Sequence, residues 1–317
     1  MKVPSKGWNA YTYSVVGLIT AITVFSFPET TSKIAANEIV ASPTTLTIKA
    51  TTTIPVLPSL PENPFDALTI EGKAGYVYDI TAGKTLYTKN ENDQMPLASI
   101  NKIMTAITAL ELSTTSTSTV IVSSEALSTE GDTGLLAGEE WDLRDLLIYT
   151  LIVSSNDGAA VAAESFNADT KYFVNEMNRR GQAIGLSRGW FHNSSGLDES
   201  SEIAGGYGSA RDVYKLMKYA LDKHGNIMNA TNKATISITS LDGFVHTGKN
   251  TNILTSKVPN LLLSKTGYSG LAGGNLAIVF QTENNHTIAV VVLGSSYDGR
   301  FVDVDKLVEA SIKAQAN

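Results

Sequence analysis

The stretch LASINKIMTAITALE, residues 97–111, decides how the rest of the chain is interpreted. Its apolar positions 100, 103, 104, 107 and 110 recur at helical spacing, which predicts a helix packed against a core. Ser99 and Lys102 share one face of that helix, with Cβ atoms about 5–6 Å apart. A desolvated lysine that has lost its proton can accept the serine's proton and generate a nucleophile. A capping serine beside a solvated lysine would give the same letters, so the pair needs support from elsewhere.

The remaining periodicity predicts a mixed fold. Two β-like runs at 75–80 and 84–90 are separated by Thr-Ala-Gly, which indicates a hairpin. Further strands are predicted at 234–240, 261–267, 275–283 and 287–296. Helices are predicted at 142–153, 158–166, 170–186, 210–225 (stopped by Gly225) and 301–314. Strands at both ends with helices between them predict an α/β (α+β) fold, in which helices and a mostly helical subdomain cover one antiparallel sheet.

Composition limits the possible functions. The chain has 317 residues, a net charge of −7 and no dense run of Lys or Arg, which argues against a nucleic-acid partner. It has no cysteine, so disulfides and thiol chemistry are excluded. Its four histidines are scattered without the spacing of metal ligands, and we expect neither a metal nor another cofactor.

The N-terminal residues 1–28 have the composition of a membrane segment. Lys2 and Lys6 precede an uncharged stretch from Gly7 to Pro28, and residues 9–27 are long enough to span a bilayer as a helix. No small-x-small cleavage site follows, which favours an uncleaved anchor over a signal peptide. In either case the remainder is expected to be extracytoplasmic, attached to the membrane by the anchor or secreted if the segment is cleaved.

A Pro/Thr-rich segment follows the predicted anchor. Six of the nine prolines fall between positions 28 and 64, so residues 29–64 are expected to form a semi-rigid linker. The folded domain is then expected to comprise residues 65–317.

Two further segments offer polar groups at the ends of apolar runs. In IVSSNDGA, Ser154 and Asn156 lie between two predicted helices, where capping residues would also be common. In LLLSKTGYSGLAGG, Lys265 and Thr266 follow an apolar strand and offer a cation and a hydroxyl to a carboxylate.

The three signals in the order S-x-x-K, S-x-N and K-T-G resemble the signature of serine penicillin-recognising enzymes. The surrounding segments, such as KTLYTKNENDQMPLASINKIMTA and LLAGEEWDLRDLLIYTLIVSSNDGAAVAAE, resemble D-alanyl-D-alanine carboxypeptidases, the low-molecular-mass penicillin-binding proteins. The resemblance covers about residues 70–310 and implies a β-lactamase/transpeptidase-like fold. It also implies a hydrolase that acts on peptidoglycan stem peptides ending in D-Ala-D-Ala and is acylated by β-lactam antibiotics.

The resemblance implies three catalytic residues. Ser99 would attack the D-Ala-D-Ala carbonyl to form an acyl-enzyme. Lys102 would be the base, with a pKa lowered by desolvation and by the charge of Lys265. Ser154 would relay a proton to the leaving amine.

Substrate-binding roles follow from the same resemblance. Asn156 would hold a substrate amide, and the backbone N–H groups of Ser99 and Tyr268 would form the oxyanion hole. The K-T-G residues Lys265, Thr266 and Gly267 would line the site, with the first two binding the terminal carboxylate. Arg300 would face that carboxylate, although a surface arginine is an equal alternative. Ser155 stands where the family usually has glycine, and we expect it to narrow the site slightly.

Rival functions and rival motifs remain. A D,D-endopeptidase would use the same residues, and a non-catalytic receptor for β-lactams or muropeptides would share the fold. A β-lactamase usually needs a distant glutamate to activate water, and Glu164 lies too close to Asn156 for that role. A second S-x-N at 165–167 and the His-Thr-Gly at 246–248 lack the expected surroundings and are rejected.

Overall fold

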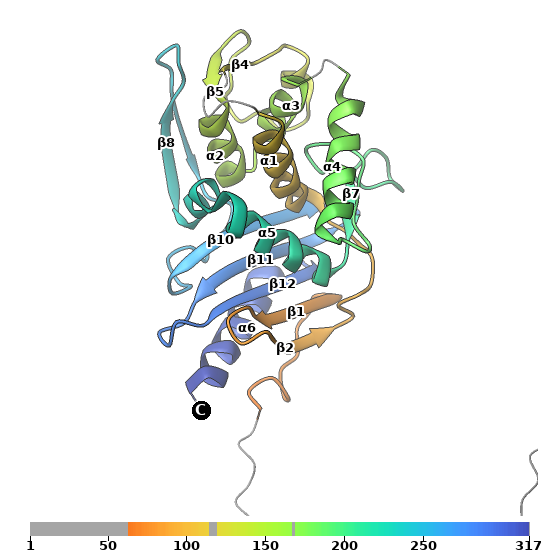
Figure 1. Ribbon diagram of the computed structural model, residues 1–317, viewed down its shortest axis with the longest axis vertical. Helices are drawn as coiled ribbons and strands as arrows, with labels where there is room; N and C mark the ends of the chain where they lie inside the picture. Colours follow the sequence, from red (N-terminus) through yellow and green to blue (C-terminus); the bar gives the residue numbers. More distant parts are fainter. Residues whose placement is uncertain (1–62, 114–118, 167–168, 317) are drawn as a thin grey trace, which may run out of the picture. The chain divides into compact units, whose positions relative to one another are not determined.

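A five-stranded antiparallel sheet brings together strands from both ends of the folded part, in the order β10-β11-β12-β1-β2 (Figure 1). The computed structural model describes residues 63–113, 119–166 and 169–316, which belong to one compact unit. The strands are β1 (Ala74–Asp79), β2 (Lys84–Lys89), β10 (Leu261–Ser269), β11 (Gly273–Gln281) and β12 (Thr287–Ser295). The predicted hairpin and the predicted antiparallel sheet are therefore confirmed.

Both faces of the sheet are covered, because alternate residues of its strands are apolar on each side. In β12, Val290 and Val292 pack toward helix α6 (Gly299–Ala316). Val291 and Leu293 pack on the opposite side, in the core shared with the other helices. The sheet is thus the middle layer, with α6 on one face and the helical subdomain on the other (Figure 1).

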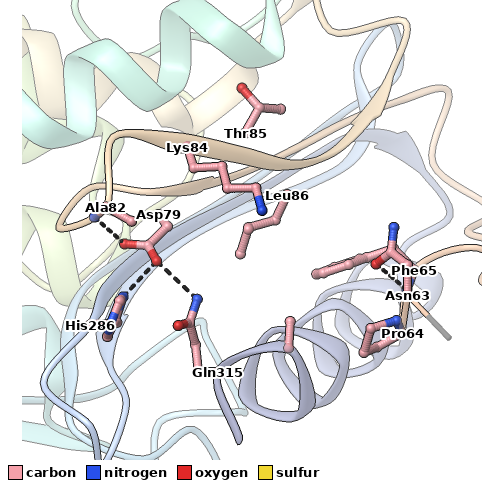
Figure 2. A pocket seen from close by; sticks show the side chains of 11 residues that line it. Asn63, Pro64, Phe65, Asp79, Ala82, Lys84, Thr85, Leu86, His286 and Gln315 are labelled. Atoms are coloured by element: carbon pink, nitrogen blue, oxygen red, sulfur yellow. Dashed lines mark hydrogen bonds and ion pairs between the residues drawn. The ribbon is translucent and has the colours of Figure 1, made fainter. Parts of the chain in front are cut away.

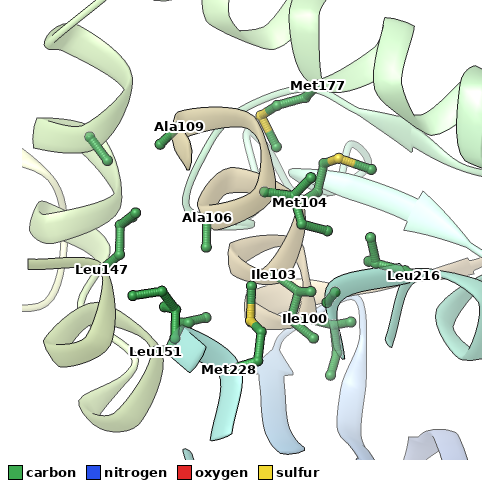
Figure 3. Packing of buried hydrophobic residues seen from close by; sticks show 14 of the residues in the cluster. Ile100, Ile103, Met104, Ala106, Ala109, Leu147, Leu151, Met177, Leu216 and Met228 are labelled. Atoms are coloured by element: carbon green, nitrogen blue, oxygen red, sulfur yellow. The ribbon is translucent and has the colours of Figure 1, made fainter. Parts of the chain in front are cut away.

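Helix α1 (Asn101–Leu112) lies at the centre of the helical subdomain and continues from the short 3-10 helix η1 (Ala98–Ile100). Nine successive residues, 101–109, are buried, so α1 is enclosed on all sides rather than on one face. Figure 3 shows Ile103 and Met104 packed among side chains of the neighbouring helices. Those helices are α2 (Leu143–Val153), α3 (Asn156–Glu164), α4 (Thr170–Ile184) and α5 (Ala210–Met228).

Some helix ends follow local sequence signals. Asp142 caps α2 by accepting hydrogen bonds from the backbone N–H groups of Arg144 and Asp145. The first segment of α5 breaks at His224, whose non-helical backbone makes a kink one residue before the predicted stop at Gly225, and a short second segment continues to Met228. Met228 is fully buried, so the segment after the kink is held by packing against the core.

Short elements complete the fold and were not predicted, apart from β8. They are β3 (Met95–Pro96), β4 (Thr119–Ile121), β5 (Glu140–Asp142), β6 (Trp190–Phe191), β7 (Gly206–Gly208), the hairpin β8–β9 (Thr235–Thr239 and Val245–Lys249), η2 (Ala126–Ser128) and η3 (Asn229–Asn232). Within residues 63–113, 119–166 and 169–316, no helix has the length and hydropathy needed to cross a bilayer. The anchor predicted at 1–28 and nearly all of the linker lie outside these residues.

Candidate active site

Lys102 and Ser99 form the centre of the site, as the three-residue spacing predicts. Lys102 Nζ lies 2.8 Å from Ser99 Oγ, 2.6 Å from Asn156 Oδ1 and 2.6 Å from the carbonyl oxygen of Ser195. A neutral amine has two N–H groups and one lone pair. It can donate to the amide and carbonyl oxygens and accept the hydroxyl proton of Ser99. The three oxygens suit an ammonium, which donates to all three. They also suit the neutral amine needed for catalysis, which donates to two of them and accepts from the Ser99 hydroxyl.

Burial is the main reason that Lys102 can be neutral. Its side chain sits on the enclosed helix α1 and has no exposed surface. Burial and the nearby charge of Lys265 hold the pKa of Lys102 well below its ordinary value, whereas Asp157 acts in the opposite direction.

The backbone around Ser99 is held by contacts on both sides. Ala98 adopts a left-handed φ of 48°, an uncommon conformation that persists where surrounding structure fixes it. The side-chain amide of Asn275 on β11 donates to the carbonyl oxygens of Pro96 and Leu97, at 3.0 and 3.1 Å. A Cβ on Gly196 would lie 2.1 Å from the Ala98 carbonyl oxygen, so glycine is required at this contact.

The S-x-N residues lie at the junction of α2 and α3. Ser154 ends α2 with a left-handed φ of 66°, and its hydroxyl accepts a hydrogen bond from Lys265 Nζ at 2.9 Å. Asn156 is the first residue of α3, and its side-chain amide donates to the Glu130 carbonyl oxygen at 2.7 Å. Ser154 and Asn156 thus contact the two lysines of the site from one turn.

Ser155 turns away from the cleft. It caps α3, is fully buried and hydrogen-bonds Asp157 and Thr133 through its hydroxyl. The narrowing expected from this serine is therefore absent.

The K-T-G residues lie on β10, the edge strand of the sheet. Lys265 is buried, and its Nζ also donates to the Thr266 carbonyl oxygen at 3.1 Å. Burial and the charge of Arg300 lower the pKa of Lys265 to about 7. The Thr266 hydroxyl lies 2.6 Å from that of Thr251.

Gly267 allows β10 to approach the nucleophile. A Cβ at this position would lie 2.6 Å from the Leu97 carbonyl oxygen and 3.3 Å from the backbone nitrogen of Ser99. The strand and η1 are therefore in backbone contact, and a side chain would push them apart. Tyr268 follows at the rim with 54% of its surface exposed.

Arg300 lies behind β10 and is buried. Its Nη1 donates to the Gly267 carbonyl oxygen at 2.8 Å, and its guanidinium stacks near Tyr297 at 4.5 Å. Its Nε has no hydrogen-bond partner in the part of the chain that the structure describes. Its role toward a substrate carboxylate remains a prediction.

The comparison with known families agrees with this geometry. The sequence profile of the D-alanyl-D-alanine carboxypeptidase family matches residues 61–296. The chain belongs to this family. D-alanyl-D-alanine carboxypeptidase DacF of Bacillus subtilis is 29% identical over 255 residues, which cover 75% of this chain and 61% of DacF. A D-alanyl-D-alanine endopeptidase of Haemophilus influenzae is 28% identical over 224 residues, covering 69% of this chain and 74% of that protein.

Solved structures of penicillin-binding proteins share the fold. The ampicillin-bound penicillin-binding protein D2 of Listeria monocytogenes superposes with a TM-score of 0.64 at 26% identity, covering 77% of this chain and 98% of that one. A D-alanyl-D-alanine carboxypeptidase of Mycobacterium tuberculosis gives a TM-score of 0.69 at 22% identity, covering 78% and 92%. The β-lactamase/transpeptidase-like fold expected from the sequence is thereby confirmed.

Several groups of the site are not indicated by any pattern in the sequence. The carbonyl oxygens of Ser195 and Glu130 belong to loops, and any residue type could supply them. Thr251 precedes β10 by ten residues and reaches Thr266 only through the fold. Asp157 stands beside Asn156, where an acidic residue in the first turn of a helix is ordinary.

The rejected motifs lie elsewhere. His246 is buried in the helical subdomain, and its Nε2 lies 2.6 Å from Glu139 Oε1. Glu164 ends α3 and accepts a hydrogen bond from Ser123 at 2.5 Å. A separate cavity of about 490 Å³ lies between the β1–β2 hairpin and the end of α6, and none of the motif residues line it (Figure 2).

Proposed function

We propose that this protein is a serine D,D-carboxypeptidase that removes the terminal D-alanine from peptidoglycan stem peptides ending in D-Ala-D-Ala. The single observation that carries the proposal is the contact of buried Lys102 with Ser99, 2.8 Å between nitrogen and oxygen. β-Lactam antibiotics imitate such a substrate, and they would acylate the same serine.

Acylation begins with proton transfer from Ser99 Oγ to the neutral amine of Lys102. The oxygen attacks the carbonyl carbon of the D-Ala-D-Ala bond and forms a tetrahedral intermediate. The backbone N–H groups of Ser99 and Tyr268, on the two sides of the η1–β10 contact, hold the developing oxyanion. Such donors contribute roughly 10²–10³ in rate each.

The C–N bond then breaks and D-alanine leaves after its amine gains a proton. Ser154 gives its hydroxyl proton to the amine and regains one from Lys265 Nζ, which its oxygen contacts at 2.9 Å. Acylation therefore leaves Lys265 neutral and Lys102 protonated. Water next adds to the acyl carbon and loses a proton to neutral Lys265 through Ser154. Lys102 returns its proton to Ser99 Oγ as the ester C–O bond breaks, and the shortened stem peptide is released. Asn156 holds the substrate's amide through both steps.

The terminal carboxylate of the substrate is bound at β10. Lys265 and Thr266 offer an ammonium and a hydroxyl side by side, and Arg300 adds positive charge from behind Gly267. Binding an anion would favour the charged form of Lys265.

Labelling of the full-length chain with a fluorescent penicillin tests the proposal. The parent chain is expected to form a slowly lost adduct on Ser99, identified by mass spectrometry, and Ser99→Ala is expected to form none. Incubation with a stem pentapeptide is expected to release D-alanine only from the parent. A folded parent that forms no adduct would contradict the assignment and favour a non-catalytic receptor, and rapid turnover of the drug would favour a β-lactamase.

A second candidate, D,D-endopeptidase, is favoured by relatives that carry that name, including the H. influenzae protein. The same residues would cut a cross-link if the cleft admits a longer leaving group. Purified cross-linked muropeptide dimers and monomeric pentapeptides, supplied at equal concentration, distinguish the two. Faster loss of the dimers than of the pentapeptides would identify the protein as an endopeptidase rather than a carboxypeptidase.

For location, the uncharged N-terminal stretch and the Pro/Thr-rich segment support an extracytoplasmic enzyme attached to the membrane through residues 9–27. Fractionation of cells producing the full chain, compared with a variant that lacks residues 1–28, tests this. The full chain is expected in the membrane fraction, and its recovery in the soluble fraction would contradict the anchor.

A further inference from the structure

Asp157 is a buried carboxylate beneath the site that the proposed chemistry does not use. It has 1% of its surface exposed, and its Oδ1 accepts hydrogen bonds from the hydroxyls of Ser155 and Thr133. The backbone N–H groups of Gly158 and Thr133 donate to its two oxygens at 2.9 and 3.3 Å. In the ranges that the structure describes, all of these hydrogen-bond partners are neutral. A buried charge that no cation contacts is costly, so its retention calls for an explanation.

The charge of Asp157 acts on the base of the site. Its carboxylate raises the pKa of Lys102, against the larger effects of burial and of Lys265. Lys265, on β10, is itself next to Arg300 of α6. Asp157 is therefore a negative group that opposes the effects of burial and of Lys265 on Lys102.

The hydrogen bonds of Asp157 also hold the loop that contacts Asn156. Thr133 is fixed from two sides, by Asp157 and by the Tyr149 hydroxyl, which donates to the Thr133 carbonyl oxygen at 2.5 Å. Three residues earlier in the same loop, the Glu130 carbonyl accepts from the Asn156 side-chain amide at 2.7 Å.

The Asn156 side chain thus has one end on the loop and the other on the base. Its Nδ2 donates to Glu130, and its Oδ1 accepts from Lys102 Nζ at 2.6 Å. The loop also approaches closely here, since a Cβ on Gly131 would lie 3.0 Å from Asn156 Nδ2. A shift of the loop would therefore be transmitted through Asn156 to Lys102.

We infer that Asp157 is a positioning residue, which ties residues 130–133 to the start of α3 so that Asn156 and Lys102 stay aligned with Ser99. Its charge is the second part of the role, acting on Lys102 through space. The inference rests on the proposed acyl-enzyme function.

Two variants of the full-length chain separate the hydrogen bonds from the charge. Thr133→Val keeps the side-chain shape and the carboxylate but removes the Thr133 hydroxyl. Asp157→Asn keeps the shape and removes the charge. Asp132→Asn, which removes a charge from an exposed position of the same loop, is the control. The readout is the second-order rate constant of acylation by a fluorescent penicillin between pH 5 and pH 10, per site titrated by adduct formation.

Both test variants are expected to acylate about ten- to a hundred-fold more slowly, as misaligned reacting groups do. In Asp157→Asn the acid limb of the profile is also expected to move to lower pH by about half a unit or more, because loss of the carboxylate lowers the pKa of Lys102 further. Thr133→Val is expected to keep the acid limb of the parent's pH profile. Asp132→Asn is expected to keep both the acylation rate and the acid limb of the parent.

A parental rate per titrated site and a parental limb in Asp157→Asn, with only a lower melting temperature, would overturn the inference and leave a structural role. If Asp157→Asn does not fold, Thr133→Val decides, and a parental rate in that variant overturns the link through the loop. A parent chain without an adduct on Ser99 is a different result, because it removes the proposed function and this inference with it.

Discussion

The side-chain nitrogen of Lys102 lies 2.8 Å from the hydroxyl oxygen of Ser99, on a helix whose residues 101–109 have almost no contact with solvent. The burial of Lys102 has two effects besides placing its amine next to the Ser99 hydroxyl. It lowers the pKa of the amine, and it leaves the two N–H groups with fixed acceptors at Asn156 and Ser195. The lone pair of a neutral amine is then directed toward Ser99, as a general base requires.

Lys102→Arg is expected to slow acylation by a fluorescent penicillin by about 10²–10⁴-fold. Arginine stays protonated in proteins and cannot accept the Ser99 proton. Lys84→Arg, at an exposed position on β2, is the control and is expected to react like the parent. A Lys102→Arg variant that acylates within ten-fold of the parent would exclude Lys102 as the base.

Lys265→Gln is expected to move the acid limb of the acylation profile to higher pH. The charge of Lys265 lowers the pKa of Lys102, so its removal raises that pKa and a higher pH is needed for the neutral amine. Because the pKa of Lys265 is about 7, the difference from the parent is expected to be largest below that pH. The exposed Lys257→Gln should leave the limb unchanged, and an unmoved limb in Lys265→Gln would contradict the coupling.

Gly267→Ala is expected to lower the free energy of unfolding by about 1–3 kcal/mol, as overpacking against backbone does. The added Cβ would meet the Leu97 carbonyl oxygen at 2.6 Å. Acylation should also slow by ten-fold or more, because Ser99 moves relative to β10. The matched control is Gly270→Ala, whose Cβ would meet nothing closer than 3.8 Å. Chemical denaturation of both variants checks the prediction, and equal stabilities would refute it.

His246→Ala is expected to lower the free energy of unfolding by about 1–3 kcal/mol, because buried Glu139 would lose its hydrogen bond to His246 and keep the one from the Leu136 N–H group. His286→Ala breaks a comparable contact, 2.7 Å from Asp79 (Figure 2), but the His286 side chain is 31% exposed. There we expect a loss of only about 0.5–1 kcal/mol, because buried Asp79 keeps hydrogen bonds from the Gln315 side chain and the Ala82 N–H group. Acylation per folded molecule should be parental in both variants. A catalytic defect in His246→Ala would mean that its rejection as a third motif is wrong.

The parts of the site that the sequence predicts are those encoded locally. Ser99 and Lys102 are related by helical spacing, and Ser154 and Asn156 by the turn between two helices. The strand containing Lys265 follows from its apolar run. In each case the relative positions of the residues are set by neighbours in the chain, so the sequence pattern alone indicates them.

The missing parts depend on distant contacts. Thr251 and the Ser195 carbonyl are brought in by loops whose course no periodicity encodes. Ser155 was expected to face the cleft, but capping of α3 and the bond to Asp157 turn it inward. The sequence signal at Gly225 marks the kink at His224, but it does not predict the second segment of α5, which is held by the burial of Met228.

Tyr268 and Tyr297 meet edge to face with ring centroids 4.9 Å apart, and each keeps more than half of its surface exposed. They border a site whose reactive groups are almost all enclosed by the core. Related sequences are therefore expected to differ at the exposed tyrosines of the rim and to agree at the buried residues of the site. Substitutions at the two tyrosines can change the ligand preference with little loss of stability. Substitutions at Lys102 or Gly267 would destabilise the fold.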